Sequence, residues 1–561
     1  MKKTGKVTEK KSEMRKFLGK GTVLFLSCIM ILSGCGQNNQ RQAPGTAAKQ
    51  EEENEEQEKS DGSETGNGQK AESQNPGTED YGKSDTSVQN MQQEFAVIEG
   101  KLTVGDTEIL FEDEDETADW EREKAVTLRL NEGNIEVDGS GAAVEGNVVT
   151  ISRAGVYVLE GTLTDGTVRV DCEDKETVRL ILNGVTIHSE TSAAIDIMNA
   201  HKTVITLADG TVNTLSDGTG FAYRDTEKEE PNAVLFSKDD LTINGSGTLN
   251  VDAVFNNGIQ SKDILKIMGG NYKITSLNHG IKGNDALAVL GGEMRISATG
   301  DGLKSDAALA FLDGKADIIQ SEEGMEGETI VIGGGTIEIT STDDGINAST
   351  DGTAVPAIYI GGGSVIVRAE GDGLDANGSI YISGGEVTVH GPERSGNGAI
   401  DYDREFLLTG GVLAAFGPGG MDQTMGVNSS QPGILMTFDE NQPAGTQVTI
   451  KDEHGGILYT FAGEKTFRTA VVSVPEFQTD ETYQLESGDT AVTFTLKDMI
   501  TYLNKDGVTD KAAMGPGGRG GGRSGGKGER PEGQEFPDGR GFSDEDRGAR
   551  TAKKGLTDAD F

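Results

Sequence analysis

A glycine followed by an aliphatic residue recurs at a nearly constant interval through the middle of this chain. Successive glycines are separated by 22, 22, 22, 21, 28 and 25 residues. A second glycine column, made mostly of Gly-Gly pairs, runs in step with the first from Gly269 to Gly411. Two columns that share a period through six intervals predict a structural repeat. The first column consists of Gly258, Gly280, Gly302, Gly324, Gly345, Gly373 and Gly398.

Apolar residues alternate on both sides of each double glycine, as in Ile330–Ile332 and Ile337–Ile339. Period-two alternation of β-branched residues indicates half-buried strands. Strands this short are unstable alone, so each must pair with its copies in neighbouring repeats. A coil of 22 residues built only from strands is one rung of a parallel β-helix, so the predicted fold class is all-β. Its inward ladder is expected to be Ile259, Ile281, Leu303, Met325, Ile346, Leu374 and Ala399.

Three folded segments are predicted around this repeat. Residues 96–250 show the same strand chemistry with a looser period, which indicates an N-terminal cap and the first rungs. The regular rungs occupy 251–420, and non-periodic strand pairs in 421–500 indicate a C-terminal β cap. The charged insert 221–231 is expected to loop out.

The two ends are expected to lie outside the fold. A basic start, a short apolar stretch and Leu-Ser-Gly-Cys predict that residues 1–34 are a lipoprotein signal peptide and that Cys35 carries the lipid. The alternative is an ordinary signal with a chance cysteine. Residues 35–95 predict a disordered acidic linker and 501–561 a disordered Gly/Arg-rich and mixed-charge tail. The predicted location is the extracellular face of a cell membrane, in a Gram-positive host.

The charge balance excludes some partners. The chain has 50 Lys+Arg against 93 Asp+Glu, a formal charge of −43. Such a chain repels phosphates, so no nucleic-acid partner is expected. Three cysteines are too few for a disulfide scaffold. An acidic protein that binds acidic sugars needs a metal ion between the two. The chain is expected to be a monomer.

Polar residues flank the repeat glycines in register. The residues directly before the glycines are Asn257, His279, Asp301, Glu323, Asp344, Asp372 and Asn397. The residues two positions after the glycines are Gln260, Lys282, Lys304, Glu326, Asn347 and Asp375. Adjacent rungs lie about 4.8 Å apart, and stacked like charges need neutralisation.

Acidic residues concentrate in the late rungs, and converging carboxylates favour Ca²⁺. The alternative is that Asp-Gly and Asn-Gly are only turn formers. Asn256, Asn257 and Asn278 are expected to form a hydrogen-bonded ladder. The predicted calcium ligands are Asp343, Asp344, Asp372, Asp375, Asp401, Asp403, Asp301 and Asp306.

Several segments carry a family resemblance. They are Gly155–Gly161, Leu180–Ile187 and Val204–Asn213, together with the rungs Asn256–Lys262, Gly300–Asp306, Asp343–Ala348 and Gly371–Asn377. Over roughly 126–420 the chain resembles the carbohydrate-binding parallel β-helix surface proteins of cellulolytic clostridia. The resemblance implies a right-handed β-helix, bound calcium, and binding of cellulose or acidic sugars. That family is similar in fold to the family-nine polysaccharide lyases, which use Ca²⁺ and a lysine base.

Three functions follow from these observations. The preferred one is a lipid-anchored surface protein whose calcium-binding β-helix binds polysaccharide through Lys282, Lys304, Tyr359 and Tyr381. A calcium-dependent lyase with Lys304 or Lys282 as base is the enzymatic alternative. Neighbouring carboxylates should raise a lysine pKa, however, which favours ion pairing of Lys304 with Asp301 or Asp306. A structural adhesin or spacer stabilised by calcium is the third.

Overall fold

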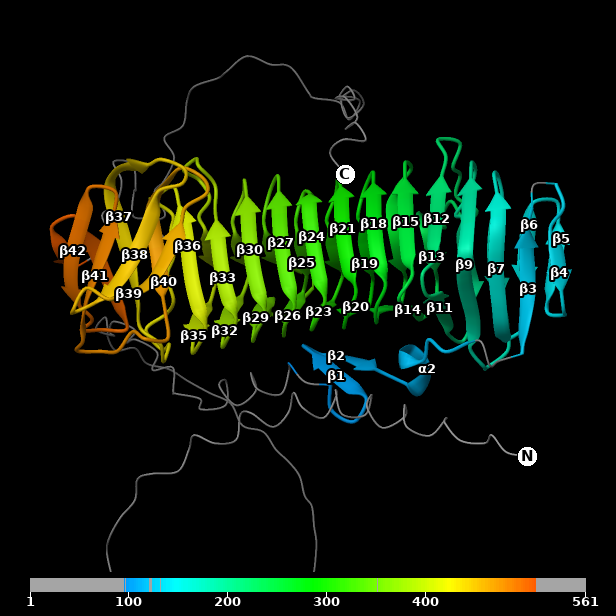
Figure 1. The fold of residues 1–561 in the computed structure, drawn as a ribbon, viewed down its shortest axis with the longest axis horizontal. Coiled ribbons are helices and arrows are strands. Elements are labelled where there is room, and N and C mark those ends of the chain that lie inside the picture. Colours follow the sequence, from blue (N-terminus) through cyan, green and yellow to red (C-terminus); the bar gives the residue numbers. More distant parts are fainter. Residues whose placement is uncertain (1–94, 96, 121–123, 132, 351, 511–561) are drawn as a thin grey trace, which may run out of the picture. The chain divides into compact units, whose positions relative to one another are not determined.

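A computed structural model describes residues 95, 97–120, 124–131, 133–350 and 352–510. The predictions for the signal peptide, Cys35, most of the linker and the tail from 511 onward therefore fall outside the described residues. Within them the chain is a β-solenoid of about 11 turns, which confirms the predicted parallel β-helix (Figure 1). No helix among the described residues is long and apolar enough to cross a membrane.

Each regular turn supplies one strand to each of three parallel sheets. Sheet 1 contains twelve strands: β5 (Ala142–Glu145), β6 (Val148–Ile151), β8 (Thr167–Asp171), β10 (Ile195–Asn199), β13 (Ala233–Ser237), β16 (Asn257–Ser261), β19 (Ile281–Gly283), β22 (Leu303–Ser305), β25 (Met325–Gly327), β28 (Ile346–Ala348), β31 (Leu374–Ala376) and β34 (Ile400–Tyr402). Only the first pair, β5 and β6, is antiparallel.

Sheets 2 and 3 follow in each rung. Sheet 2 contains β3 (Ala125–Leu130), β7 (Gly155–Leu163), β9 (Val178–Ser189), β11 (Thr203–Leu207), β14 (Leu241–Gly245), β17 (Ile264–Ile267), β20 (Ala286–Val289), β23 (Ala308–Phe311), β26 (Thr329–Ile332), β29 (Ala357–Ile360), β32 (Ser379–Ile382) and β35 (Glu405–Leu408). The ends of β7 and β9 begin sheet 3, which continues with β12 (Val212–Asp217), β15 (Thr248–Ala253), β18 (Asn271–Ser276), β21 (Glu293–Ala298), β24 (Lys315–Gln320), β27 (Thr336–Ser341), β30 (Ser364–Ala369), β33 (Glu386–His390) and β36 (Val412–Gly417). A short strand, β4 (Glu136–Asp138), pairs with β3.

The inward aliphatic ladder of sheet 1 forms as predicted up to Leu374, and its members from Ile259 onward are fully buried. The last member differs by one residue. Leu374 pairs with Ile400 rather than with Ala399. The chain before β34 is longer than in other rungs, so Ala399 takes the glycine position and Gly398 lies one place earlier.

The two glycine columns are required for different reasons. Glycines of the first column lie against the next rung: a Cβ at Gly345 would overlap the Val367 side chain and lie 2.5 Å from the Gly373 carbonyl oxygen. Second-column glycines adopt positive φ, as at Gly335 (77°) and Gly363 (84°), in the turn between sheets 2 and 3.

Residues 101–116 form a strap along the outer face of sheet 2. The hairpin β1 (Lys101–Val104) and β2 (Thr107–Leu110) packs on small outward residues such as Ala288 and Ala310. The following turn of helix, α2 (Asp113–Glu116), contacts β14. These residues, assigned from the sequence to the N-terminal cap, thus run beside the middle rungs (Figure 1).

A buried carboxylate fixes the strap. Asp115 is fully buried and forms ion pairs with Lys202 at 2.9 Å and Lys266 at 3.1 Å. Thr242 donates a further hydrogen bond to the same carboxylate. The buried charge is therefore paired and hydrogen-bonded, as burial of a carboxylate requires.

Two other segments flank the regular rungs. The insert 221–231 loops out only at its exposed tip, residues 226–229. Its base packs back on the solenoid, where Arg224 donates to Asp196 on sheet 1 at 2.8 Å and Phe221 stacks on Phe255. The C-terminal cap contains β37 (Gly433–Gln442), β40 (Phe467–Ser473), β43 (Ile500–Asn504) and β44 (Gly507–Thr509), and a separate antiparallel sheet of β38 (Gln447–Asp452), β39 (Ile457–Ala462), β41 (Thr482–Ser487) and β42 (Thr490–Thr495). The cap thus extends past residue 500, because the alternating Ile500–Asn504 forms a paired strand.

Candidate functional site

The outer face of sheet 1 carries a file of polar side chains, one from each rung. Strand register places Lys304 between Lys282 and Glu326, and Asp375 between Asn347 and Asp401. Neighbouring strand residues point into the core, so these side chains face outward. The predicted alignment of this column is confirmed.

The residues before the glycines form a capping ladder. The Asn257 side chain accepts a hydrogen bond from the backbone N–H of His279 at 3.1 Å, one rung further on. Asp301, Asp344 and Asp372 accept in the same way from the next rung, at 3.3, 2.6 and 2.5 Å. The predicted asparagine ladder also forms, with Asn278 donating to Asn256 at 2.9 Å. Each capping aspartate therefore has a structural role that needs only one of its two oxygens.

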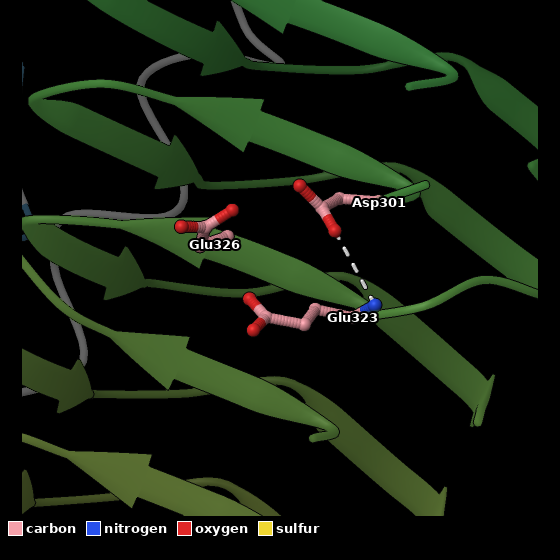
Figure 2. A group of neighbouring side chains, drawn as sticks. All are labelled: Asp301, Glu323 and Glu326. Atoms are coloured by element: carbon pink, nitrogen blue, oxygen red, sulfur yellow. Dashed lines mark hydrogen bonds between the residues drawn. The ribbon is translucent and has the colours of Figure 1, made fainter. Parts of the chain in front are cut away.

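A compact carboxylate group lies in the middle rungs, where oxygens of Asp301, Glu323 and Glu326 lie within 4.8 Å of one another (Figure 2). Lys304 lies among them, with its Nζ 2.9 Å from Asp301 and a second ion pair to Glu326. Although burial opposes the charge, these carboxylates hold the pKa of Lys304 well above its usual range. Lys304 is therefore an ion-pair partner, and its proton is held too tightly for a general base.

Glu323 differs from the other carboxyls of this group. Burial, with the charges of Glu326 and Asp301, raises the pKa of Glu323 to about 8. Asn347 donates to Glu323 Oε1 at 2.8 Å, while Glu323 Oε2 and Asn347 Oδ1 are buried without a hydrogen-bond partner among the described residues. A proton on Oε2 would complete an acid–amide pair and satisfy both atoms. Glu323 is therefore the carboxyl of the middle-rung group that holds its proton at neutral pH, and burial also raises the pKa of Glu326.

The late rungs hold four carboxylates without such compensation: Asp344, Asp372, Asp375 and Asp401. Burial, followed by the charges of the neighbouring aspartates, raises the pKa of Asp372 to about 6 and of Asp375 to about 7. The pKa of Asp344 is raised mainly by burial. Within the described part of the chain no lysine or arginine forms an ion pair with any of the four. We call these four residues the late-rung acidic group. Its all-oxygen donor set suits a hard cation such as Ca²⁺. Among the described residues, however, only Asp301, Glu323 and Glu326 bring three carboxylate oxygens within 4.8 Å of one another, so a cation here would have to draw the four aspartates closer together.

The remaining residues predicted for the site lie outside the late-rung acidic group. Asp343 and Asp403 are exposed beside it, and Asp306 forms an ion pair with Lys282 at 2.8 Å. Tyr359 and Tyr381 stack with ring centroids 4.8 Å apart, but they lie on sheet 2, in the strands β29 and β32. The tyrosine pair and the acidic group are therefore on different faces of the solenoid.

Two loops beside the late rungs were not predicted from the sequence. The connection from sheet 1 to sheet 2 takes two residues in most rungs, as at 377–378, but runs from 349 to 356 after β28. The connection into β34 is also extended, over 391–399. The spacings of 28 and 25 in place of 22 were the available signal. Both departures from the period flank the late-rung acidic group.

Comparison with known proteins finds relatives and a matching family. A curated relative from Acetivibrio thermocellus, named a carbohydrate-binding domain-containing protein, is 40% identical over 146 residues, which are 26% of this chain and 50% of the relative. This chain thus spans about half the length of that relative. The solved structure of a polysaccharide lyase-like protein from C. thermocellum, a gadolinium derivative, matches with 32% identity and a TM-score of 0.38, over 46% of this chain and 96% of that one. The family of carbohydrate-binding domain-containing proteins matches residues 145–389 and 307–453. The β-helix rungs from β6 onward and the acidic face of sheet 1 fall within those residues, and the chain belongs to this carbohydrate-binding domain family.

Proposed function

We propose that this chain is a calcium-dependent polysaccharide-binding protein that uses the outer face of sheet 1. The observation that carries the proposal is the late-rung acidic group, whose charges lack a counter-ion in a member of a carbohydrate-binding family. Like charges stacked at rung spacing are destabilising, so a bound cation would relieve a cost already present in the fold.

The ligands would be Asp344, Asp372, Asp375 and Asp401. Asp344 and Asp372 each use one oxygen for the capping ladder and keep the other for a metal ion. Ca²⁺ takes six to eight oxygen ligands in flexible geometry, so water and sugar oxygens complete the shell. The bound cation would neutralise the aspartates and accept the carboxylate or hydroxyl oxygens of the polysaccharide.

We further propose export and attachment to the outer surface of a cell membrane through a lipid on Cys35. This rests on the basic start, the short apolar stretch and Leu-Ser-Gly-Cys alone. A monomer presenting sheet 1 would bind uronate-containing polysaccharide or cellulose outside the cell.

Calorimetry of the purified chain tests the proposal. Tetragalacturonate should bind in about 1 mM CaCl₂, the concentration range of extracellular calcium sites. A chelator should abolish this binding. Asp372→Asn with Asp375→Asn should lower calcium affinity at least about tenfold, while Asp489→Asn on the distant cap should leave it unchanged. Calcium binding without any effect on sugar binding would leave only the spacer function.

The enzymatic alternative receives no support from Lys304. A lyase base must give up its proton near neutral pH, whereas two carboxylates keep Lys304 charged. The other candidate base, Lys282, forms an ion pair with Asp306 at 2.8 Å. Incubation with polygalacturonate should therefore yield no unsaturated product that absorbs in the ultraviolet.

A further inference from the structure

A polar cleft of about 580 Å³ opens beside the file of sheet 1, across the rungs of β22, β25, β28 and β31. Its size falls within the range of small-molecule sites, about 300–1,000 Å³. Four rungs span about 14 Å along the solenoid, enough for a short oligosaccharide. The side chains that line it include Lys304, Asp306, Glu326, Ser349, Thr350 and Asn377.

Ser349, Thr350 and Gly352, from the long connection after β28, line one wall of this cleft. Thr350 Oγ1 donates to Glu328 at 2.6 Å, and the N–H of Gly352 donates back to Thr350 Oγ1 at 3.0 Å. The backbone N–H groups of Ser349 and Ala357 donate to Gly327 and Glu328 at both ends of the loop. These hydrogen bonds fix the connection at both ends and at Thr350, so the cleft is preorganised and the entropic cost of binding is reduced.

The chemistry of the cleft selects against an acidic ligand. Its only cation, among the described residues that line it, is Lys304, whose ammonium is already shared by two carboxylates. Asp306 and Glu326 add negative charge, so a uronate carboxylate placed here would be repelled. Carboxylates accept hydrogen bonds from sugar hydroxyls, and the amide of Asn377 and the hydroxyl of Ser349 both donate and accept.

We propose that this cleft is a subsite for neutral sugar units of the bound glycan, and that it works without a metal ion. The inference rests on the proposed carbohydrate-binding function and divides the face of sheet 1 into two parts. The late-rung acidic group would hold acidic units through a cation, and the adjoining cleft would hold neutral units through direct hydrogen bonds.

The test compares two probes, cellopentaose and tetragalacturonate, by calorimetry with calcium and with chelator. Cellopentaose should bind equally in both conditions. The double variant Ser349→Ala with Asn377→Ala removes two hydrogen-bonding groups and should weaken cellopentaose binding about 5- to 100-fold. Tetragalacturonate binding with calcium should not change. The matched control, Thr340→Ala with Thr388→Ala on the outer face of sheet 3, should alter neither.

Two outcomes would overturn the inference separately from the proposed function. If cellopentaose binds but the cleft variant binds it as tightly as the unsubstituted chain, the subsite lies elsewhere. If chelator abolishes cellopentaose binding, the neutral subsite requires the cation. Binding of neither probe would overturn the proposed function, and this inference with it.

Discussion

Asp375 makes the folded chain less stable at alkaline pH when no metal is bound. Its pKa is ordinarily 3.8 and rises to about 7 in the folded chain, because burial and four nearby aspartates disfavour its charge. The folded state therefore binds the Asp375 proton more tightly than the unfolded state does. Stability is full below the unfolded pKa and falls as the pH rises through the interval between the two values.

The magnitude follows from that interval. A rise of about three pKa units, at about 1.36 kcal/mol each, gives about 4 kcal/mol as an upper limit. Asp375 is only half-buried, so solvent screening reduces the penalty to about 1–2 kcal/mol. Asp375→Asn removes the charge and keeps the shape, so in chelator at pH 8 it should stabilise the chain by this amount.

Thermal unfolding followed by circular dichroism measures the effect. In chelator at pH 8 the variant should unfold about 2 °C above the unsubstituted chain, and at pH 4 the difference should disappear. With calcium the order should reverse, because the variant has lost a ligand. Asp489→Asn makes the same charge change in an exposed turn of the cap and should show neither effect. A variant that is less stable in chelator at pH 8 would refute the reasoning.

Three further substitutions test the main structural contacts. Lys304→Met leaves two carboxylates unpaired and should lower the free energy of unfolding by about 2 kcal/mol in chelator, less than the loss of a fully buried ion pair would. Adding calcium should partly restore the unfolding temperature. Asp115→Ala leaves buried Lys266 without a carboxylate partner and Lys202 with Glu112 alone, so it should cost about 3 kcal/mol, with faster amide exchange across the strap. The exposed Asp113→Ala should change little. Gly345→Ala should cost about 1–3 kcal/mol or more in thermal unfolding because its Cβ meets the next rung, while Gly327→Ala, whose Cβ lies 3.4 Å from its nearest neighbour, should be tolerated better.

The sequence predicted the repeating part of the fold well, because its determinants are local. Alternation of apolar residues sets the strand faces, and a fixed period sets the rungs, so the inward file from Ile259 to Leu374 and the outward file from Gln260 to Asp375 both follow. The register fails only at Ala399, where the longer connection shifts the pattern by one residue.

Contacts that depend on side-chain direction or on distant segments were not predictable. Asp301, Asp344 and Asp372 look like free carboxylates in sequence, yet each caps a backbone N–H of the following rung. Asp115 stands in an acidic run that suggests a solvated surface, but its partner Lys266 lies 151 residues away. The small outward residues at 286, 288, 308 and 310 were the one sequence signal that another segment covers sheet 2.

The strap also changes how this solenoid should unfold. Repeat proteins are nearly one-dimensional, since each rung contacts only its neighbours and melting can start at either end. Here β1 contacts β23 and β26, β2 contacts β20, and α2 contacts β14. One segment therefore ties the rung of β14 to the rungs of β20, β23 and β26, which β14 does not pair with directly. Opening any of these rungs must also loosen the strap from the others. We therefore expect the rungs from β14 to β26 to unfold as one cooperative unit, with fraying confined to the rungs beyond them.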